Sequence, residues 1–309
     1  MASDTSNTLN CKPLDGLNVS DALHEKYQRP VEWNGEEYEV VHAVDQAGNT
    51  AIHYAAWGGH VNAIQVLLQE CGANPDCKNK EGMSPLDFAV AGDHTDALAV
   101  IQKALSKSSG SENQPSEGTA QGLSPLHRAA MHGATETLVV LISQGADPSC
   151  RGTSGNTALH LAAQRGKEEC VKALLETTVQ GGHDVANDFG LTPLHFACLG
   201  GHVRIFEKLL HAGASPFSRT EAGSSALHLA ASAGSHEMSA VLAAHFSERG
   251  QSIVDTLDND ELSPIDMALS SGYKNLASRL AQWAYLSSRT QAIYKTIPPI
   301  ENESAQLVS

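Results

Sequence analysis

A phrase of seven residues recurs along the chain and constrains the fold more than any other feature of the sequence. It reads T-A-I-H-Y-A-A in its first copy, and the seven copies begin at Thr50, Ser84, Ser124, Thr157, Thr192, Ser225 and Ser263. Successive copies start 34, 40, 33, 35, 33 and 38 residues apart. A period of this length predicts an array of similar units rather than one mixed domain.

Each phrase carries the signals of a helix start. The opening Thr or Ser is a good N-cap, and proline follows it in four copies, at the first helical position, where a missing N–H costs nothing. In the fifth copy Leu194, Ala197 and Cys198 are spaced as one helix face, and Gly200-Gly201 then breaks the chain before a second apolar helix. A helix pair this small cannot bury its apolar face alone, so the units must stack.

These residues resemble the ankyrin repeat family, whose core is T-P-L-H-x-A. The fullest copies also end in G-A-x-P, as in Gly213-Ala214-Ser215-Pro216. The resemblance implies an all-α ankyrin-repeat solenoid of stacked helix-turn-helix units with β-turn or hairpin fingers. It divides the chain into an N-terminal segment (1–44, partly disordered, with a possible capping hairpin), repeats near 45–78, 79–105, 119–151, 152–186, 187–219, 220–257 and 258–280, a polar insert (106–119), and a C-terminal cap and flexible tail (281–309).

Two copies depart from the pattern. The second has Asp87 in place of the histidine and Asp93 in place of a glycine, and it runs into the polar stretch 106–119. We therefore expect a weak joint after the second repeat, where protease should cut first. The seventh copy has Asp266 in place of the histidine, as befits a terminal repeat. A final helix over 275–286 should close the core with Trp283 and Tyr285.

Composition argues against several classes of partner. The formal net charge is -15, which disfavours nucleic acid and anionic membrane surfaces. No apolar run is long enough to span a bilayer, and the first residues do not resemble a secretion signal. Six cysteines are scattered without a C-x-x-C pair, a pattern typical of reduced thiols. We expect a monomer in the cytoplasm, or also in the nucleus.

Histidine and cysteine are the residues that could carry chemistry. Five histidines occupy the same place in the repeat, so stacking spaces them about 8 to 10 Å apart, too far to share one zinc ion. We expect them to form hydrogen bonds between turns, and we predict no metal and no cofactor. Cys198 and Cys170 fall at core positions. Cys77 and Cys150 fall at hairpins, where we expect more exposure, and this leaves redox sensing open.

The resemblance implies a non-catalytic module, a scaffold, adaptor, assembly chaperone or inhibitor, that binds another protein in the concave groove of the array. The alternative is an enzyme or enzyme subunit that uses a reactive Cys or His there. In the family, contacts come from the fingertips and the ends of the first helices. Carried over to this chain, these positions give the candidate partner-binding residues Trp57, Met131, His132, Gln164, Arg165, Phe189 and Leu199.

Overall fold

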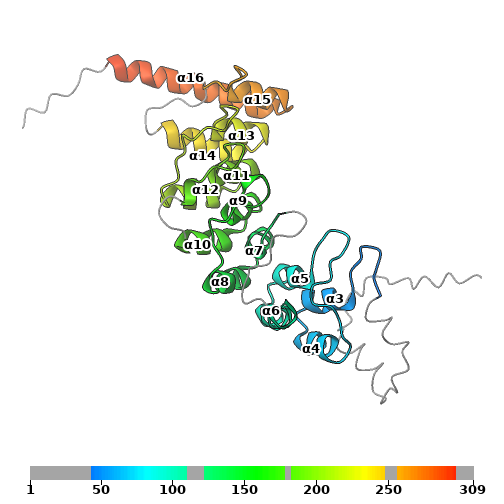
Figure 1. The fold of residues 1–309 in the computed structure, drawn as a ribbon. Coiled ribbons are helices and arrows are strands. Elements are labelled where there is room, and N and C mark those ends of the chain that lie inside the picture. Colours follow the sequence, from blue (N-terminus) through cyan, green and yellow to red (C-terminus); the bar gives the residue numbers. More distant parts are fainter. Residues whose placement is uncertain (1–42, 110–121, 178–181, 248–255, 297–309) are drawn as a thin grey trace, which may run out of the picture. The chain divides into compact units, whose positions relative to one another are not determined.

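The computed structural model describes residues 43–109, 122–177, 182–247 and 256–296, which form helices joined by long loops (Figure 1). The chain divides into two compact units, 1–153 and 154–309. The expected capping hairpin, most of the polar insert and the C-terminal tail lie outside the described residues. The first unit holds the first three copies of the phrase, and the second unit holds the other four.

The first unit is built of three helix pairs. In each pair a short helix from the phrase packs against a second helix, and the short helices also pack on one another, α3 on α5 and α5 on α7. The helices are α3 (Ala51–Trp57), α4 (Val61–Gln69), α5 (Pro85–Ala91), α6 (Thr95–Ser109), α7 (Pro125–His132) and α8 (Thr135–Ser143).

The second unit repeats this arrangement with four helix pairs. Its short helices stack in the order α9, α11, α13 and α15, and its second helices lie beside them. They are α9 (Ala158–Gln164), α10 (Glu168–Thr177), α11 (Pro193–Gly200), α12 (Val203–His211), α13 (Ala226–Ser232), α14 (His236–Ser247), α15 (Pro264–Ser270) and α16 (Lys274–Thr296). Two 3-10 turns, η1 (Thr153–Gly155) and η2 (Gly182–Asp184), lie in the loops. The expected all-α solenoid is confirmed.

The N-cap assignments explain where the short helices begin. Each first helix starts directly after the Thr or Ser of its phrase, and each forms a capping box with the residue three positions later. In the fifth copy the Thr192 hydroxyl accepts the backbone N–H of His195, while the His195 ring accepts the N–H of Thr192 at 3.1 Å. The repeated phrase therefore encodes a reciprocal cap as well as an apolar stripe.

Two boundaries differ from the sequence-based expectation. Helix α6 continues to Ser109, four residues past the expected end of the second repeat at 105, and Ser106 and Lys107 lie on its exposed side. At the other end, α16 runs unbroken from Lys274 to Thr296, past the predicted end at 286. Trp283 is half-buried, but Tyr285 is 64% exposed, so the prediction that it closes the core is wrong.

Candidate partner-binding surface

The phrase histidines join successive repeats. In the first repeat the Thr50 N–H donates to Nδ1 of His53, so this nitrogen carries no proton and Nε2–H donates to the carbonyl of Met83 in the next repeat at 3.1 Å. The same arrangement links His160 to Leu191, His195 to Ser218 and His228 to Leu262, each at 3.0 Å. All of these carbonyls lie in the loop that precedes a first helix. The histidines therefore fix the loops, which we call fingers.

Burial favours the neutral imidazole in three of these histidines. It lowers the pKa of His53, His195 and His228, against the smaller opposing effect of their backbone hydrogen bonds. A neutral ring is what the geometry requires, because a protonated Nδ1 could not accept the N–H of the capping residue. The structural role expected for these histidines is thus consistent with both their contacts and their charge.

We predict that acid destabilises the array in a window set by these histidines. Their pKa lies near 6.5 in the unfolded chain and lower in the folded one, so below pH 6.5 the unfolded state binds more protons. The melting temperature should therefore fall as the pH is lowered from 6.5 to 5, and should show no histidine contribution above 7. The measurement is thermal unfolding by circular dichroism at each pH. A melting temperature that stays constant between pH 7 and 5 would contradict the prediction. Exposed carboxylates such as Asp266, whose pKa is lowered by hydrogen bonds from Ser263, affect stability only near pH 4 and below.

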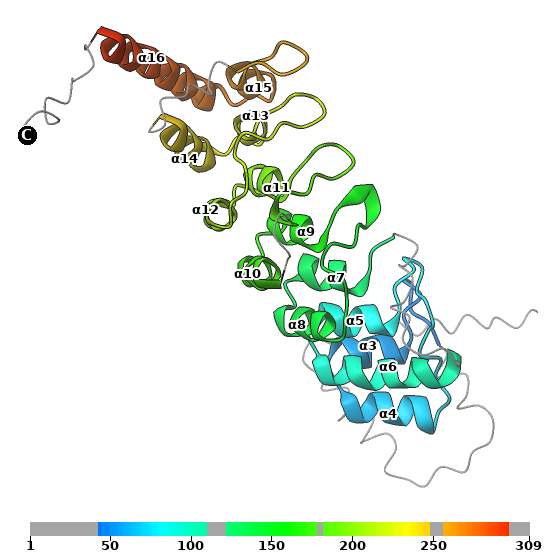
Figure 2. The ribbon, with the colours of Figure 1, turned by 60° about the vertical axis from the view of Figure 1, so that its left-hand side comes forward.

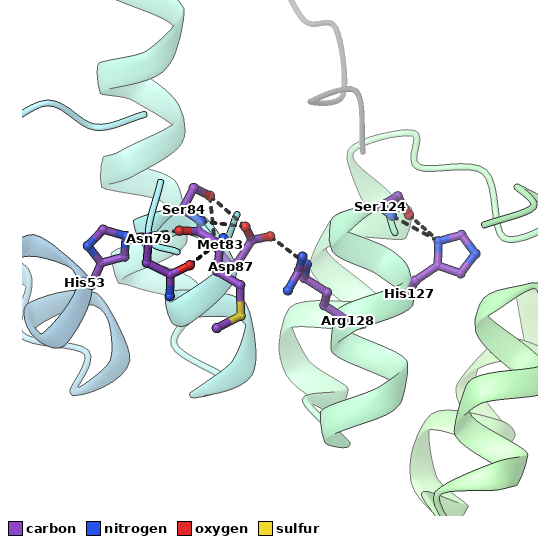
Figure 3. A network of polar contacts seen from close by, with 8 residues as sticks. All are labelled: His53, Asn79, Met83, Ser84, Asp87, Ser124, His127 and Arg128. Carbon is purple, nitrogen blue, oxygen red and sulfur yellow. Dashed lines mark hydrogen bonds and ion pairs between the residues drawn. The ribbon is translucent and has the colours of Figure 1, made fainter. Parts of the chain in front are cut away.

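The second and third repeats are joined by a buried ion pair instead of a histidine link (Figure 3). Asp87 accepts the N–H and the hydroxyl of Ser84 at 2.8 and 2.9 Å, and its other oxygen lies 3.0 Å from Nε of Arg128 on α7. The two side chains are only 4% and 3% exposed. Asp87 thus replaces both functions of the histidine, the local cap and the link to the next repeat.

A second carboxylate crosses between the same two repeats. Asp93 follows α5 with φ of 58°, at a place where other copies have glycine. Its Oδ1 accepts the N–H of Thr137 at 2.8 Å, in the first turn of α8. Two charge-assisted contacts therefore link the second and third repeats. The weak joint expected at 106–119 stays a prediction, because most of that stretch lies outside the described residues.

Neighbouring fingers of the second unit touch along their tips, on one side of its helix stack (Figure 2). The N–H groups of Asp188, Glu221 and Asn259 donate to the carbonyls of Ser154, Phe189 and Ala222, at 3.1, 3.1 and 3.0 Å. At Gly190 (φ 73°) a Cβ would lie 2.6 Å from the Glu221 nitrogen, so only glycine permits this approach. The fingertips therefore form one connected row. In the first unit, Lys80 N–H donates to Ala47 in the same way.

The candidate binding residues lie where the repeat pattern places them, but in separate units. In the first unit Trp57 ends α3 and is 59% exposed, while Met131 and His132 end α7. In the second unit Gln164 and Arg165 end α9, Phe189 lies at a fingertip with 57% of its surface exposed, and Leu199 lies near the end of α11. Met131 and Leu199 are half-buried, so the expectation that they are solvated is only partly right.

The thiols at core positions are unsuited to catalysis. Cys198 and Cys170 are fully buried. Burial raises the pKa of Cys198 far above its ordinary value, and it also raises the pKa of half-buried Cys77. A protonated thiol is a poor nucleophile. Within the described residues no group of three His, Cys, Asp or Glu side chains could hold a metal ion, and no helix there is long and apolar enough to cross a membrane.

Comparison with known proteins decides the family. A family model described as ankyrin repeats (3 copies) matches residues 31–107, 53–152 and 126–220. The chain belongs to the ankyrin repeat family. Ankyrin repeats are protein–protein interaction modules.

Relatives share this ankyrin segment within much longer proteins. The human transient receptor potential cation channel subfamily A member 1 is 28% identical over 182 residues, 57% of this chain and 16% of the channel. The E3 ubiquitin-protein ligase KEG of Arabidopsis thaliana is 28% identical over 169 residues, 55% of this chain and 10% of the ligase. Human SH3 and multiple ankyrin repeat domains protein 2 is 32% identical over 163 residues, 52% of this chain and 8% of that protein. This ankyrin chain thus spans at most a sixth of their lengths.

Sequence reasoning missed the residues that replace the standard ankyrin contacts. Arg128 stands where other phrases have an apolar or aromatic residue, and a basic residue one turn into a buried helix was the available signal for an acidic partner. Asp93 departs from the glycine of the other copies, but its contact with Thr137 of the next repeat depends on the stacking geometry, which the sequence does not contain. Glu261 has a φ of 60° at a finger position that is glycine in the two preceding fingers, and this break in the glycine pattern is its only signal in the sequence.

Proposed function

We propose that this ankyrin chain is a non-catalytic module, a scaffold, adaptor, assembly chaperone or inhibitor, that binds a partner protein through its fingers and the ends of its first helices. One observation carries the proposal: Trp57 and Phe189, at two positions that ankyrin proteins use for contacts, expose more than half of their surface. Exposed aromatic side chains at a protein surface are favoured binding hot spots. The histidines and capping residues that hold the fingers are engaged in hydrogen bonds within the fold. The exposed side chains are therefore the ones available to contact a partner.

We predict that Trp57→Ala or Phe189→Ala weakens partner capture by about 2 kcal/mol with little change in stability. To find partners, a photo-cross-linking amino acid is placed at position 57 or 189 of the full chain. After irradiation in cell extract, mass spectrometry identifies the cross-linked proteins. A matched probe replaces Val139, an exposed apolar residue on the second helix α8. Partners found at 57 or 189 but absent at 139 are then retested against the alanine variants.

A core variant separates loss of binding from loss of folding. Leu194 is 1% exposed, and Leu194→Ala should lower the free energy of unfolding by about 2 to 5 kcal/mol. If Trp57→Ala and Phe189→Ala both melt early and the residual folded protein captures partner normally, the assignment of this surface is wrong. Partner adducts that form equally well at position 139 would point to the second helices instead.

A further inference from the structure

The fingers of the second unit combine exposed apolar groups with negative charge. Phe189 and Leu262 are exposed, and they lie among the carboxylates of Asp188, Glu221, Asp260 and Glu261, all of which are exposed as well. We call these six residues the acidic finger surface. The tip hydrogen bonds place Glu221 beside Phe189, and the Asn259 side chain, adjoining Asp260, donates to the carbonyl of Glu221 at 2.9 Å. The fingers that carry these six residues are therefore joined in one continuous row.

Charge is distributed unevenly over this unit. Within the described finger residues 182–191, 215–224 and 256–262, Arg219 is the one Lys or Arg, and its Nη1 is held by the carbonyls of Gly223 and Leu257 at 2.8 and 2.7 Å. The second helices instead mix both signs, as in the pair of Lys208 with Glu168 at 3.3 Å. In the first unit the finger before α5 is mixed too, because Lys78 and Lys80 accompany Asp76 and Glu81. The chain as a whole is acidic, but its described fingers at 182–191, 215–224 and 256–262 are more uniformly so than the second helices or the finger before α5.

Glu261 has a strained backbone conformation, and its side chain makes no contact that would offset the strain within the described residues. A non-glycine residue at φ of 60° is strained, and the matching position in the two preceding fingers is Gly190 or Gly223. Asp93 accepts the same strain, but its carboxylate caps α8. The described residues provide no hydrogen-bond or ion-pair partner for the Glu261 carboxylate, which points to solvent. Its charge is therefore available to a binding partner.

We propose that the acidic finger surface binds a basic peptide segment, rich in arginine and carrying aliphatic residues. Arginine matches the carboxylates in charge and stacks on an aromatic ring such as Phe189, while aliphatic side chains cover Leu262. Fixed opposite charges also raise the rate of encounter and exclude acidic segments. This inference rests on the proposed function as a binding module and names the chemical class of its partner.

The test uses fluorescein-labelled peptides of four Arg-Leu-Ala repeats and their counterparts with Glu or Gln in place of Arg. Fluorescence anisotropy with the full chain should show binding of the Arg peptide that weakens as salt is raised, and at least tenfold weaker binding of the other two. The triple variant Glu221→Gln, Asp260→Asn, Glu261→Gln should weaken the Arg peptide about tenfold. A control triple on the second helices, Glu169→Gln, Glu176→Gln and Glu207→Gln, makes the same change in net charge at exposed sites and should leave the affinity within twofold.

Each outcome decides the proposal. Equal weakening by the two triples would show attraction by net charge alone and would overturn it, as would equal binding of the Glu peptide. Glu261→Gly adds a second readout: relief of the positive φ should raise the melting temperature by about 2 to 4 °C while the Arg peptide binds more weakly. Unchanged affinity in this variant would remove Glu261 from the surface. If cross-linking at position 189 captures partners but the Arg peptide does not bind, the proposed function stands and the basic partner class is wrong.

Discussion

Replacing Arg128 with leucine should lower the free energy of unfolding of the first unit by about 3 to 5 kcal/mol. The change leaves the carboxylate of Asp87, 4% exposed, without its cationic partner 3.0 Å away. An uncompensated buried charge is costly, and the apolar side chain that replaces arginine offers it no hydrogen bond. Urea unfolding followed by circular dichroism measures the loss, with hydrogen exchange in α5 and α7 to locate it.

The repeat itself supplies the rescue. The fourth and sixth phrases read T-A-L-H-L-A-A and S-A-L-H-L-A-A, with histidine at the position of Asp87 and leucine just after it. The double variant Asp87→His, Arg128→Leu removes both charges and restores the histidine link between repeats, so it should recover most of the lost stability. A double variant as unstable as Arg128→Leu would show that the ion pair is not the reason for the loss, since both charges would then be absent.

The fold could be predicted from the sequence because it is stated seven times. Each copy repeats the N-cap, the apolar stripe and the glycine break. The pattern can therefore be assigned from the other copies even where one copy departs from it. The two departures at Asp87 and Asp93 were harder to interpret. Each looks like a loss when its own repeat is considered alone, and each is compensated by a residue 41 or 44 positions away, Arg128 or Thr137. Pairing across repeats depends on the stacking geometry, which local patterns do not contain.

The candidate surface was predictable in position but not in exposure. The register of the phrase located Trp57, Phe189 and Leu199, because equivalent positions recur in every repeat. Whether each side chain is solvated depends on its neighbours in the stack: Leu199 is half-buried, whereas Phe189 at a fingertip is not. The sequence also did not predict that the acidic fingers lie in one unit, because the boundary between the units follows from the packing of the helices.

Replacing His195 with alanine should be nearly as damaging as the loss of Arg128, by about 2 to 4 kcal/mol. The ring is fully buried, accepts the N–H of Thr192 at 3.1 Å and donates to the carbonyl of Ser218 at 3.0 Å. Alanine would leave a cavity and two polar groups without their partner.

The finger that carries Glu221 should then loosen, because His195 holds its base at Ser218. Hydrogen exchange should accelerate at the amides of Thr220 and Gly223, which close the fingertip turn, and the Arg-Leu-Ala peptide should bind more weakly. His211→Ala is the matched control, since that ring is exposed and, among the described residues, bonds to the Glu207 carbonyl of its own helix at 2.7 Å. If both variants lose the same stability, or if His195→Ala leaves hydrogen exchange in the finger unchanged, the histidine does not position the binding surface. If only His195→Ala loses stability and peptide affinity, the buried imidazole is a positioning residue for the acidic fingers.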